Sequence, residues 1–398
     1  MATTNQIDES NATPTQVRSS VLFLLPAVQP GRIQALLERL TAALPAKELV
    51  VAIPGEVPGD LNAQVQLVAA PASNTTWTLT AEDFVTALEM AKNCGARALV
   101  ILGPEAESLR SSGISELADA VLSARSDLAI PRYDLPPHAG LVNSSILYPL
   151  TRSLFSTRTR FPLPIDLGLS MRMAERLGLI AQRLVSTNQA SAPLWVVNEA
   201  AIAGMTTEEI NAGPRELPQP PDSGLNVILP LVTASLFTDI EAKAAFWQRA
   251  RVTPPPTRQF PIPANTPIDA AGEVPSLIQA FRLANTNLQD IWSLILPPNT
   301  MLGLKRLARV EGEAFRLPDQ LWVRIIFDFL IAYRLRTLNR GHLLGALVPL
   351  YLAWVAGHLN TIAAGGDPER HIEAIASAFE ADKAYLVSRW RWPDRFNP

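Results

Sequence analysis

One short apolar run constrains the fold of this chain more than any other segment. Residues 98–102 (Ala-Leu-Val-Ile-Leu) are all apolar, and Gly103-Pro104 ends the run before two acidic residues, Glu105 and Glu107. A continuous apolar run of this length, bounded by turn residues, is typical of a central strand in a parallel sheet. Ligands of open α/β sheets collect at the carboxyl ends of such strands. The run therefore predicts a buried strand and a functional edge that begins at Gly103.

Strand and helix patterns alternate around this run. We expect strands at residues 21–26, 48–53, 65–69, 127–131 and 194–197, an antiparallel edge strand at 208–212, and helices at 32–44, 80–94, 115–124 and 170–177. Thr80 is a suitable N-cap for the helix at 80–94, and Asp83 takes the capping-box position. Alternation of strands with helices indicates an α/β fold with a doubly wound, mainly parallel sheet.

Proline-rich residues 214–221 mark a boundary, because such stretches are typical of exposed connections. Helical patterns follow at residues 225–251, 319–336, 343–362 and 369–386. Residues 1–20 are polar and lack the apolar core of a signal peptide. The sequence thus predicts a disordered leader at 1–20, an α/β domain at 21–220 and a helical C-terminal domain at 221–398.

Composition excludes several classes of partner and compartment. The net charge of −3 gives no strong field toward nucleic acid or an anionic membrane surface. The single cysteine, Cys94, excludes an internal disulfide framework and predicts a reducing, cytoplasmic location. Residues 343–359 are apolar but shorter than the roughly 20 residues that a bilayer requires, and Pro349 interrupts them. We expect a buried helix there and no transmembrane segment.

Several segments, in this order, carry a family resemblance: Pro26-Ala27-Val28-Gln29 after the first strand, Leu102-Gly103-Pro104-Glu105, Ile130-Pro131-Arg132-Tyr133, Pro162-Leu163-Pro164-Ile165-Asp166 and Trp195-Val196-Val197-Asn198-Glu199. Together with the helical tail they resemble the GT-A fold glycosyltransferases. The closer resemblance is to the retaining bacterial enzymes of the glucosyl-3-phosphoglycerate synthase and mannosylglycerate synthase type. It extends over residues 21–398 and implies a GT-A-like sheet with a helical C-terminal domain.

The resemblance also implies an activity, which is transfer of a sugar from a nucleotide-diphosphate sugar to a small hydroxylated acceptor with retention at the anomeric carbon. Positioning and stabilisation of the diphosphate leaving group would supply most of the rate. Mg²⁺ or Mn²⁺ would be the cofactor and a homodimer the assembly. The residues implied are Asp166 and Asn198 for catalysis, Pro26, Ala27, Gln29, Gly103 and Glu105 for the nucleotide, Arg132, Tyr133, His138 and Pro164 for sugar and acceptor, and Glu105 for the metal.

Departures from the family pattern support a second hypothesis. Gly103 stands where the family has the first aspartate of Asp-x-Asp, and no histidine lies near Arg215, where the family places a metal-binding one. Val28 replaces a nucleotide-contacting tyrosine, and Asn198 replaces a carboxylate and cannot act as a base. The alternative function is a catalytically inactive relative that serves as a binding or partner subunit. A third hypothesis, a membrane-associated transferase, rests on residues 343–359 alone.

The candidate residues also have structural interpretations. Glu105 and Glu107 either hold a divalent metal or lie on a solvated turn. Asp166 either orients an acceptor hydroxyl by a charge-assisted hydrogen bond or caps the helix that follows Ser170. Arg132, with Arg152 and residues 158–160, either clamps a diphosphate without metal or belongs to the protein surface. His138 lies in a Pro-Pro-His-Ala-Gly loop that either covers the substrate or only connects two elements.

Overall fold

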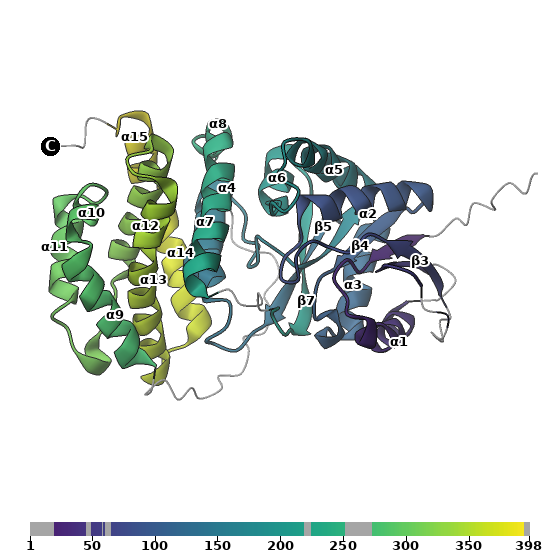
Figure 1. Cartoon of the computed structure of the whole chain (residues 1–398), viewed down its shortest axis with the longest axis horizontal. Coiled ribbons are helices and arrows are strands. Elements are labelled where there is room, and N and C mark those ends of the chain that lie inside the picture. The colour runs from purple at the N-terminus through teal and green to yellow at the C-terminus, as the bar shows by residue number, and fades with distance from the viewer. Residues whose placement is uncertain are drawn as a thin grey trace, which may run out of the picture.

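The computed structural model describes residues 20–44, 49–57, 59, 65–218, 224–250 and 273–393. It shows two parts side by side, an α/β part and a helical part (Figure 1). The predicted leader lies outside the described residues except for Ser20, and so does the predicted boundary at residue 220.

Among the described residues, seven strands form one sheet in the order β3-β2-β1-β4-β6-β5-β7. Their bounds are β1 Val21–Leu24, β2 Leu49–Pro54, β3 Gln66–Ala70, β4 Ala98–Leu102, β5 Leu128–Asp134, β6 Asp166–Ser170 and β7 Thr207–Pro214. Strand β6 runs antiparallel to its neighbours β4 and β5, and the other pairs are parallel. The predicted α/β fold with a mainly parallel sheet is confirmed, and β4 lies buried near its centre.

One predicted strand is absent, and the predicted edge strand is present with the opposite direction. Residues 194–197 do not form a strand, because α6 (Val196–Ala203) begins inside them. The predicted antiparallel strand at 208–212 is part of β7, which pairs with β5 in parallel. Both errors have one cause, since a short apolar run suits a buried helix as well as a buried strand. The helix carries the chain across the sheet, so that β7 enters in the direction of β5.

Helices cover both faces of the sheet, as predicted. Helices α1 (Ile33–Ala43) and α3 (Ser111–Leu122) pack on one face. Helices α2 (Ala81–Asn93), α5 (Met171–Ser186) and α6 pack on the other (Figure 1). The predicted capping box of α2 is confirmed, because the Thr80 backbone N–H donates to the Asp83 carboxylate over 2.8 Å.

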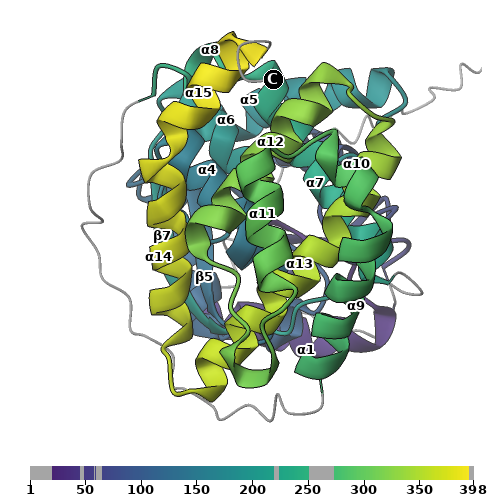
Figure 2. The same cartoon turned by 90° about the vertical axis from the view of Figure 1, so that its left-hand side faces the viewer.

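The C-terminal residues are helical, as predicted, in more pieces than the sequence pattern indicates. The helices are α7 Leu225–Ala242, α8 Ala244–Trp247, α9 Val274–Asn287, α10 Gln289–Ser293, α11 Pro298–Leu307, α12 Asp319–Leu335, α13 Arg340–Ala363, α14 Pro368–Ala381 and α15 Lys383–Arg391. Helices α12 and α13 form the centre, and α9, α10 and α11 form the outermost layer (Figures 1 and 2).

One helix from the first half of the chain joins this helical core. A π-helical turn (Asn143–Leu147) leads into α4 (Tyr148–Phe155), with Pro149 near the junction. The apolar residues of both segments pack with α7, α12 and α13 in one buried cluster, to which Trp195 also belongs. The Trp322 indole N–H donates to the carbonyl of Ser145 over 2.9 Å. Residues from the first half of the chain therefore belong to the core of the helical part, whereas the two faces of the sheet have clusters of their own.

Among the described residues, two helices have the length and apolar composition to cross a membrane, α7 and α13. The apolar window is 78% buried inside the protein in α13 and 33% buried in α7. Helix α13 contains residues 343–359, and its high burial matches the predicted core helix. Helix α7 keeps exposed apolar residues on one face, Val227 and Leu231 among them.

Candidate functional site

The sheet brings several of the predicted residues to one edge. The parallel strands β1, β4, β5 and β7 end at this edge, whereas the antiparallel strand β6 begins there. Gly103 and Glu105 follow β4, Tyr133 lies near the end of β5, and Asp166 is the first residue of β6. The edge therefore collects residues that are far apart in the sequence, which is the usual place for a ligand in this class of fold.

Asp166 is the centre of this edge and is fully buried. Its carboxylate accepts hydrogen bonds from the Gly103 backbone N–H at 2.9 Å and from the Tyr133 hydroxyl at 2.7 Å. It also accepts from Nε and a terminal nitrogen of Arg215, at 2.9 and 3.2 Å. The predicted alternative, a helix cap, is wrong, because Ser170 itself caps α5 by accepting from the Met173 N–H.

Arg215, the first residue after β7, supplies the charge that balances Asp166. Both side chains have no exposed surface. The remaining guanidinium N–H groups donate to the carbonyls of Pro104, Glu105 and Glu216 and to the Ser108 hydroxyl. A guanidinium has five N–H donors, so these contacts and the bonds to Asp166 use all of them.

The pKa values at this edge follow from burial and from the ion pair. Burial alone would lower the pKa of Arg215, but the Asp166 carboxylate outweighs it and the net direction is upward. Burial, together with the nearby Asp166 charge, raises the pKa of Tyr133 well above its ordinary value. Both directions keep Arg215 charged and Tyr133 protonated, so the hydrogen-bond donors toward Asp166 stay in place at neutral pH.

Two backbone features of the loop after β4, at Gly103 and Glu105, accompany this ion pair. A Cβ atom at Gly103 would lie 2.5 Å from the backbone oxygen of Ile165, which leaves no room for a side chain. Glu105 adopts a left-handed conformation with φ of 58°, which is uncommon for a residue other than glycine. This conformation accompanies the hydrogen bond from Arg215 to the Glu105 carbonyl. An aspartate at position 103 is therefore sterically excluded in this backbone.

The residues at this edge do not fit a divalent metal. Within the described ranges, no group of three or more His, Cys, Asp or Glu side chains is placed to hold one. Position 103 has no side chain, and the Asp166 carboxylate is bonded to Arg215. Glu107 pairs with Arg32 over 3.3 Å. The Glu105 side chain is half-buried at the edge and is one carboxylate where a metal would need several ligands.

The turn after β1 is an accessible part of this edge. Gln29 is exposed and Ala27 is half-buried, whereas Pro26 and Val28 are buried. The Pro26 carbonyl accepts from the Ser73 N–H at 2.7 Å, which fixes the turn. The predicted nucleotide-binding turn thus presents the side chain of Gln29 to solvent.

Three of the arginines predicted as diphosphate clamps instead bind the helical part. Arg132 pairs with Glu369 of α14 over 3.0 Å, and Arg160 pairs with the same carboxylate over 3.1 Å. Arg152 pairs with two further glutamates of α14, Glu373 at 2.6 Å and Glu380 at 2.9 Å. Burial would raise the pKa of Glu369, but Arg160 and Arg132 outweigh it and lower the pKa. These contacts join the two parts of the protein.

The remaining predicted residues lie apart from Asp166 or beside it without contacting its carboxylate. Asn198 is buried in α6, and its amide donates to Asp239 of α7 over 2.8 Å. Lys243 pairs with Asp239 and with Glu199, so Asn198 belongs to a polar cluster between α6 and α7. No contact between described residues joins Asn198 to Asp166. Pro164 is buried just before β6.

His138 is exposed on the loop that follows β5. Sequence reasoning missed three kinds of residue, namely the cation that balances Asp166, the hydroxyl of Ser108 and the glutamates of α14. Arg215 had a local signal, since it is a basic residue shortly after the strand predicted at residues 208–212. The glutamates had none, because only the fold brings α14 to α4.

Comparison with known proteins gives structural neighbours only. No family model matches the sequence, and no curated protein matches it. Crystal structures of glucosyl-3-phosphoglycerate synthase from Mycobacterium tuberculosis are similar to part of the chain. The complex with phosphoglyceric acid has 12% identity and a TM-score of 0.34, and covers 56% of this chain and 79% of that one. The complex with Mn²⁺, uridine diphosphate and phosphoglyceric acid has 12% identity and a TM-score of 0.36, and covers 56% and 78%.

A third structure of that synthase, with Mg²⁺ and uridine diphosphate, has 12% identity and a TM-score of 0.35, and covers 56% of this chain and 78% of that one. Similarity of this extent assigns no role to any residue here. What the chain's own structure shows is a mixed α/β protein with a mostly parallel seven-stranded sheet and a helical C-terminal part.

Proposed function

We propose that this chain is a glycosyltransferase-like protein that acts as a binding or partner subunit and does not transfer sugar. The observation that carries the proposal is the buried ion pair of Asp166 and Arg215. A group that orients or deprotonates an acceptor hydroxyl needs a lone pair that the substrate can reach. Asp166 has no exposed surface, and four hydrogen bonds occupy its two oxygens.

Stabilisation of a diphosphate leaving group also lacks support at this edge. It requires a metal or a cation with donors turned toward the phosphates. The N–H donors of Arg215 all bond to groups inside the protein. Arg132, Arg152 and Arg160 bind the glutamates of α14. The residues of the Asp-x-Asp position do not fit a metal. The chemistry implied by the family resemblance is therefore missing at two separate points.

Glycosyl transfer itself is the second candidate function. It is favoured by the accessible part of the edge, where Gln29 is exposed and Ala27 and Glu105 are half-buried. In this alternative, the edge binds a nucleotide-diphosphate sugar and the sugar passes with retention to a small hydroxylated acceptor, with Mg²⁺ or Mn²⁺ as cofactor. Homodimer formation and a cytoplasmic location stay predictions in either case.

Calorimetric titration with UDP, GDP and UDP-glucose, with and without Mg²⁺ or Mn²⁺, separates the two functions. We expect the metals to leave the binding heats unchanged and UDP-glucose to release no UDP in the presence of glycerate derivatives or sugars. Glu105→Gln should then behave like the control Glu175→Gln, which changes an exposed residue of α5. Metal-dependent binding that Glu105→Gln abolishes, or release of UDP, would refute the proposal and establish the transferase.

A further inference from the structure

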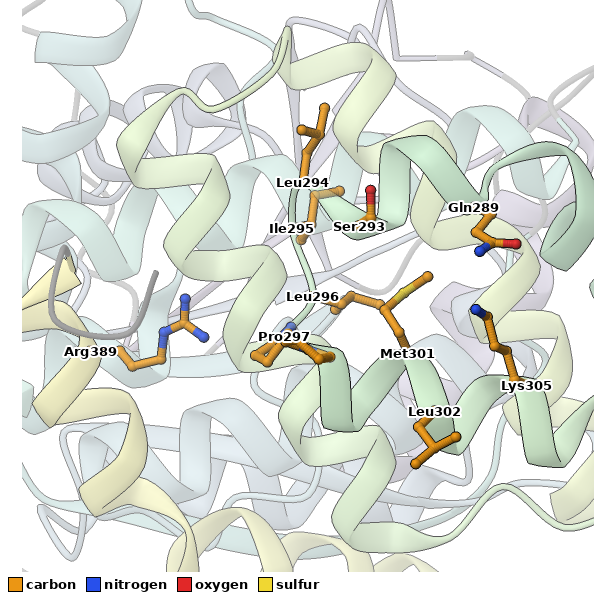
Figure 3. A pocket seen from close by; sticks show the side chains of 11 residues that line it. Gln289, Ser293, Leu294, Ile295, Leu296, Pro297, Met301, Leu302, Lys305 and Arg389 are labelled. Atoms are coloured by element: carbon orange, nitrogen blue, oxygen red, sulfur yellow. The ribbon is translucent and has the colours of Figure 1, made fainter. Parts of the chain in front are cut away.

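Helix α11 lies in the outermost layer of the helical part (Figure 2). Two cavities lie on either side of it. The smaller cavity has a volume of about 470 Å³. It lies between α11 and the chain formed by α10 and residues 294–297 (Figure 3). The larger has a volume of about 770 Å³ and lies between α11 and α12. Pro297 and Arg389 line both cavities, so the two meet at the N-terminal end of α11. Cavities that hold small organic ligands have about 300–1,000 Å³.

Both walls combine apolar side chains with cationic ones. In the smaller cavity Leu294 and Leu302 are 60% and 46% exposed, which is unusual for large apolar residues. In the larger cavity Leu307, Val310 and Leu321 supply the apolar surface. An apolar wall that water contacts in the free protein is stabilised when an apolar ligand covers it.

All charged residues that line the two cavities are positive. Lys305 and Arg389 line the smaller cavity, and Arg306, Arg316 and Arg324 line the larger one together with Arg389. Neither wall, taken over the described residues, includes a carboxylate. Carboxylates balance two of these cations from outside the cavities, since Arg389 pairs with Asp328 and Arg324 with Asp382.

Lys305 and Arg306 are neighbours on α11, and both are exposed. They line different cavities, so they place a positive charge on each side of the helix. Arg389 is 6% exposed and lies at the point where the cavities meet. A negative head group in either cavity would meet an exposed cation of α11, and charge-assisted hydrogen bonds of this kind are the stronger class.

Helix α11 is the wall that the two cavities share. Four of its residues are buried, Thr300, Met301, Leu304 and Leu307. At Gly303 a Cβ atom would lie 3.0 Å from the side chain of Leu321, so α11 approaches α12 closely at this glycine. Met301, Leu304 and Leu307 belong to the core of the helical part, so α11 separates the two cavities and is itself anchored to the core.

We propose that the two cavities around α11 bind a single-chain amphiphile with an anionic head, such as a long-chain carboxylate or a single-chain lipid phosphate. The apolar chain lies against leucines of both cavities, Leu302 in the smaller one and Leu307 and Leu321 in the larger one, and the head meets Lys305 or Arg306. This site is on the outer side of the helical part and is separate from the edge that contains Asp166. The proposal is therefore independent of the proposed function.

Fluorescence of dansyl-undecanoate, a fatty-acid probe that brightens in apolar cavities, tests the proposal with the full chain. We expect the probe to bind, and palmitate or lysophosphatidate to displace it at a concentration about tenfold lower than the uncharged hexadecanol, because one charge-assisted contact is worth roughly a factor of ten. The two anions distinguish the head groups. Equal displacement by hexadecanol would refute the anionic head, and absence of probe binding would refute the site.

Matched variants locate the probe. Lys305→Glu/Arg306→Glu should weaken binding about tenfold or more, whereas Arg309→Glu, next to α11 and lining neither cavity, should not. Leu302→Asp should weaken binding, and Leu283→Asp, at another exposed leucine outside both cavities, should not.

Unchanged binding in both cavity variants would show that the probe lies elsewhere and would overturn the assignment. Binding to phosphatidylglycerol vesicles without binding to monomeric amphiphiles would also overturn it, in favour of a membrane surface. The same holds for a dimer that Leu302→Asp dissociates, which would assign this face to a second copy of the chain.

Discussion

The ion pair between Asp166 and Arg215 predicts a large asymmetry between single and double variants. Arg215→Met leaves the Asp166 carboxylate buried with two neutral donors, and loss of one partner of a buried pair costs about 3–5 kcal/mol. The double variant Arg215→Met/Asp166→Asn should regain much of this loss. Urea unfolding measures the free energies, with Arg110→Met, at an ion pair where Arg110 is 54% exposed, as the control. Equal stability of the single and double variants would contradict the assignment.

Gly103 gives a steric prediction at the same edge. Gly103→Ala places a Cβ atom 2.5 Å from the Ile165 oxygen, and overpacking of this kind costs about 1–3 kcal/mol of stability. Gly345→Ala is the control, because the site on α13 has open space around the added atom, and it should gain up to about 1 kcal/mol through helix propensity. Thermal unfolding compares the two. A neutral Gly103→Ala would show that the loop after β4 can shift, and that an aspartate fits there.

His358 predicts an acid-sensitive stability. It is fully buried, its Nδ1 lies 2.8 Å from Nδ1 of His371, and its ring stacks on Trp354. Burial, followed by the neighbouring His371 and Arg160, lowers the pKa of His358 to about 3. Because the unfolded chain binds this proton more readily, the contribution is complete above pH 6.5 and is lost as the pH falls toward 3. At pH 5 the loss is about 2 kcal/mol.

The measurement is urea unfolding at pH 7.5 and pH 5. His358→Gln should flatten the pH dependence by about that amount, whereas His342→Gln should leave it unchanged, since His342 is exposed at the start of the same helix. The same slope in His358→Gln and the parent would exclude His358 as its source.

At the scale of elements, α14 is held to the rest of the protein by charge. Glu369 and Glu380 bind Arg160 and Arg152, which are 5% and 3% exposed. In Glu369→Gln/Glu380→Gln these arginines lose charged partners, and each such hydrogen bond is worth about 1.5–3 kcal/mol. We expect backbone amides of α14 to exchange with deuterium tenfold faster or more. Glu241→Gln, at a half-exposed pair with Arg340, should have little effect. Unchanged exchange would mean that apolar packing alone holds α14.

The elements themselves show what local sequence can and cannot predict. Strands β1 to β5 and helices α1 to α3 were predictable, because their apolar spacing and turn residues are local signals. The direction of β7 was not, since it depends on whether residues 196–203 form a helix. The steric requirement for glycine at position 103 could not be predicted either. It arises from the Ile165 oxygen, which the pairing of β4 with β6 brings close to Gly103.

The candidate site was predictable in its place and not in its chemistry. An apolar strand followed by Gly103-Pro104-Glu105 marks the functional edge, and Asp166 does lie at that edge. The partner of its carboxylate comes from 49 residues further along the chain. Arg132 and Arg160 have the composition of a phosphate clamp, and only the packing of α14 shows that they bind Glu369. Long-range pairing decides the role of each of these residues.

For the whole molecule, the core that residues 143–155 share with the C-terminal helices predicts that both parts unfold together. The Trp322 indole bonds the Ser145 carbonyl at 2.9 Å, and Ser145 lies on the segment that connects β5 with the helical part. Hydrogen exchange in increasing urea should therefore expose peptides of β4 and α13 at the same concentration. Trp322→Phe should shift both peptides equally, by about 1–3 kcal/mol, and Trp392→Phe, at a residue that is 62% exposed, should shift neither. Separate transitions would show two independent units.

The distance between Asp166 and Arg215 along the chain also has a consequence for biosynthesis. A chain leaves the ribosome from its N-terminus, so Asp166 emerges 49 residues before its partner. Until then, closing the sheet around β6 would bury a carboxylate without a counter-charge, which is costly. Arg215 directly follows β7, the last strand. Arg215, which neutralises Asp166, therefore leaves the ribosome together with the end of β7. We expect the sheet to close around β6 only after that point in synthesis.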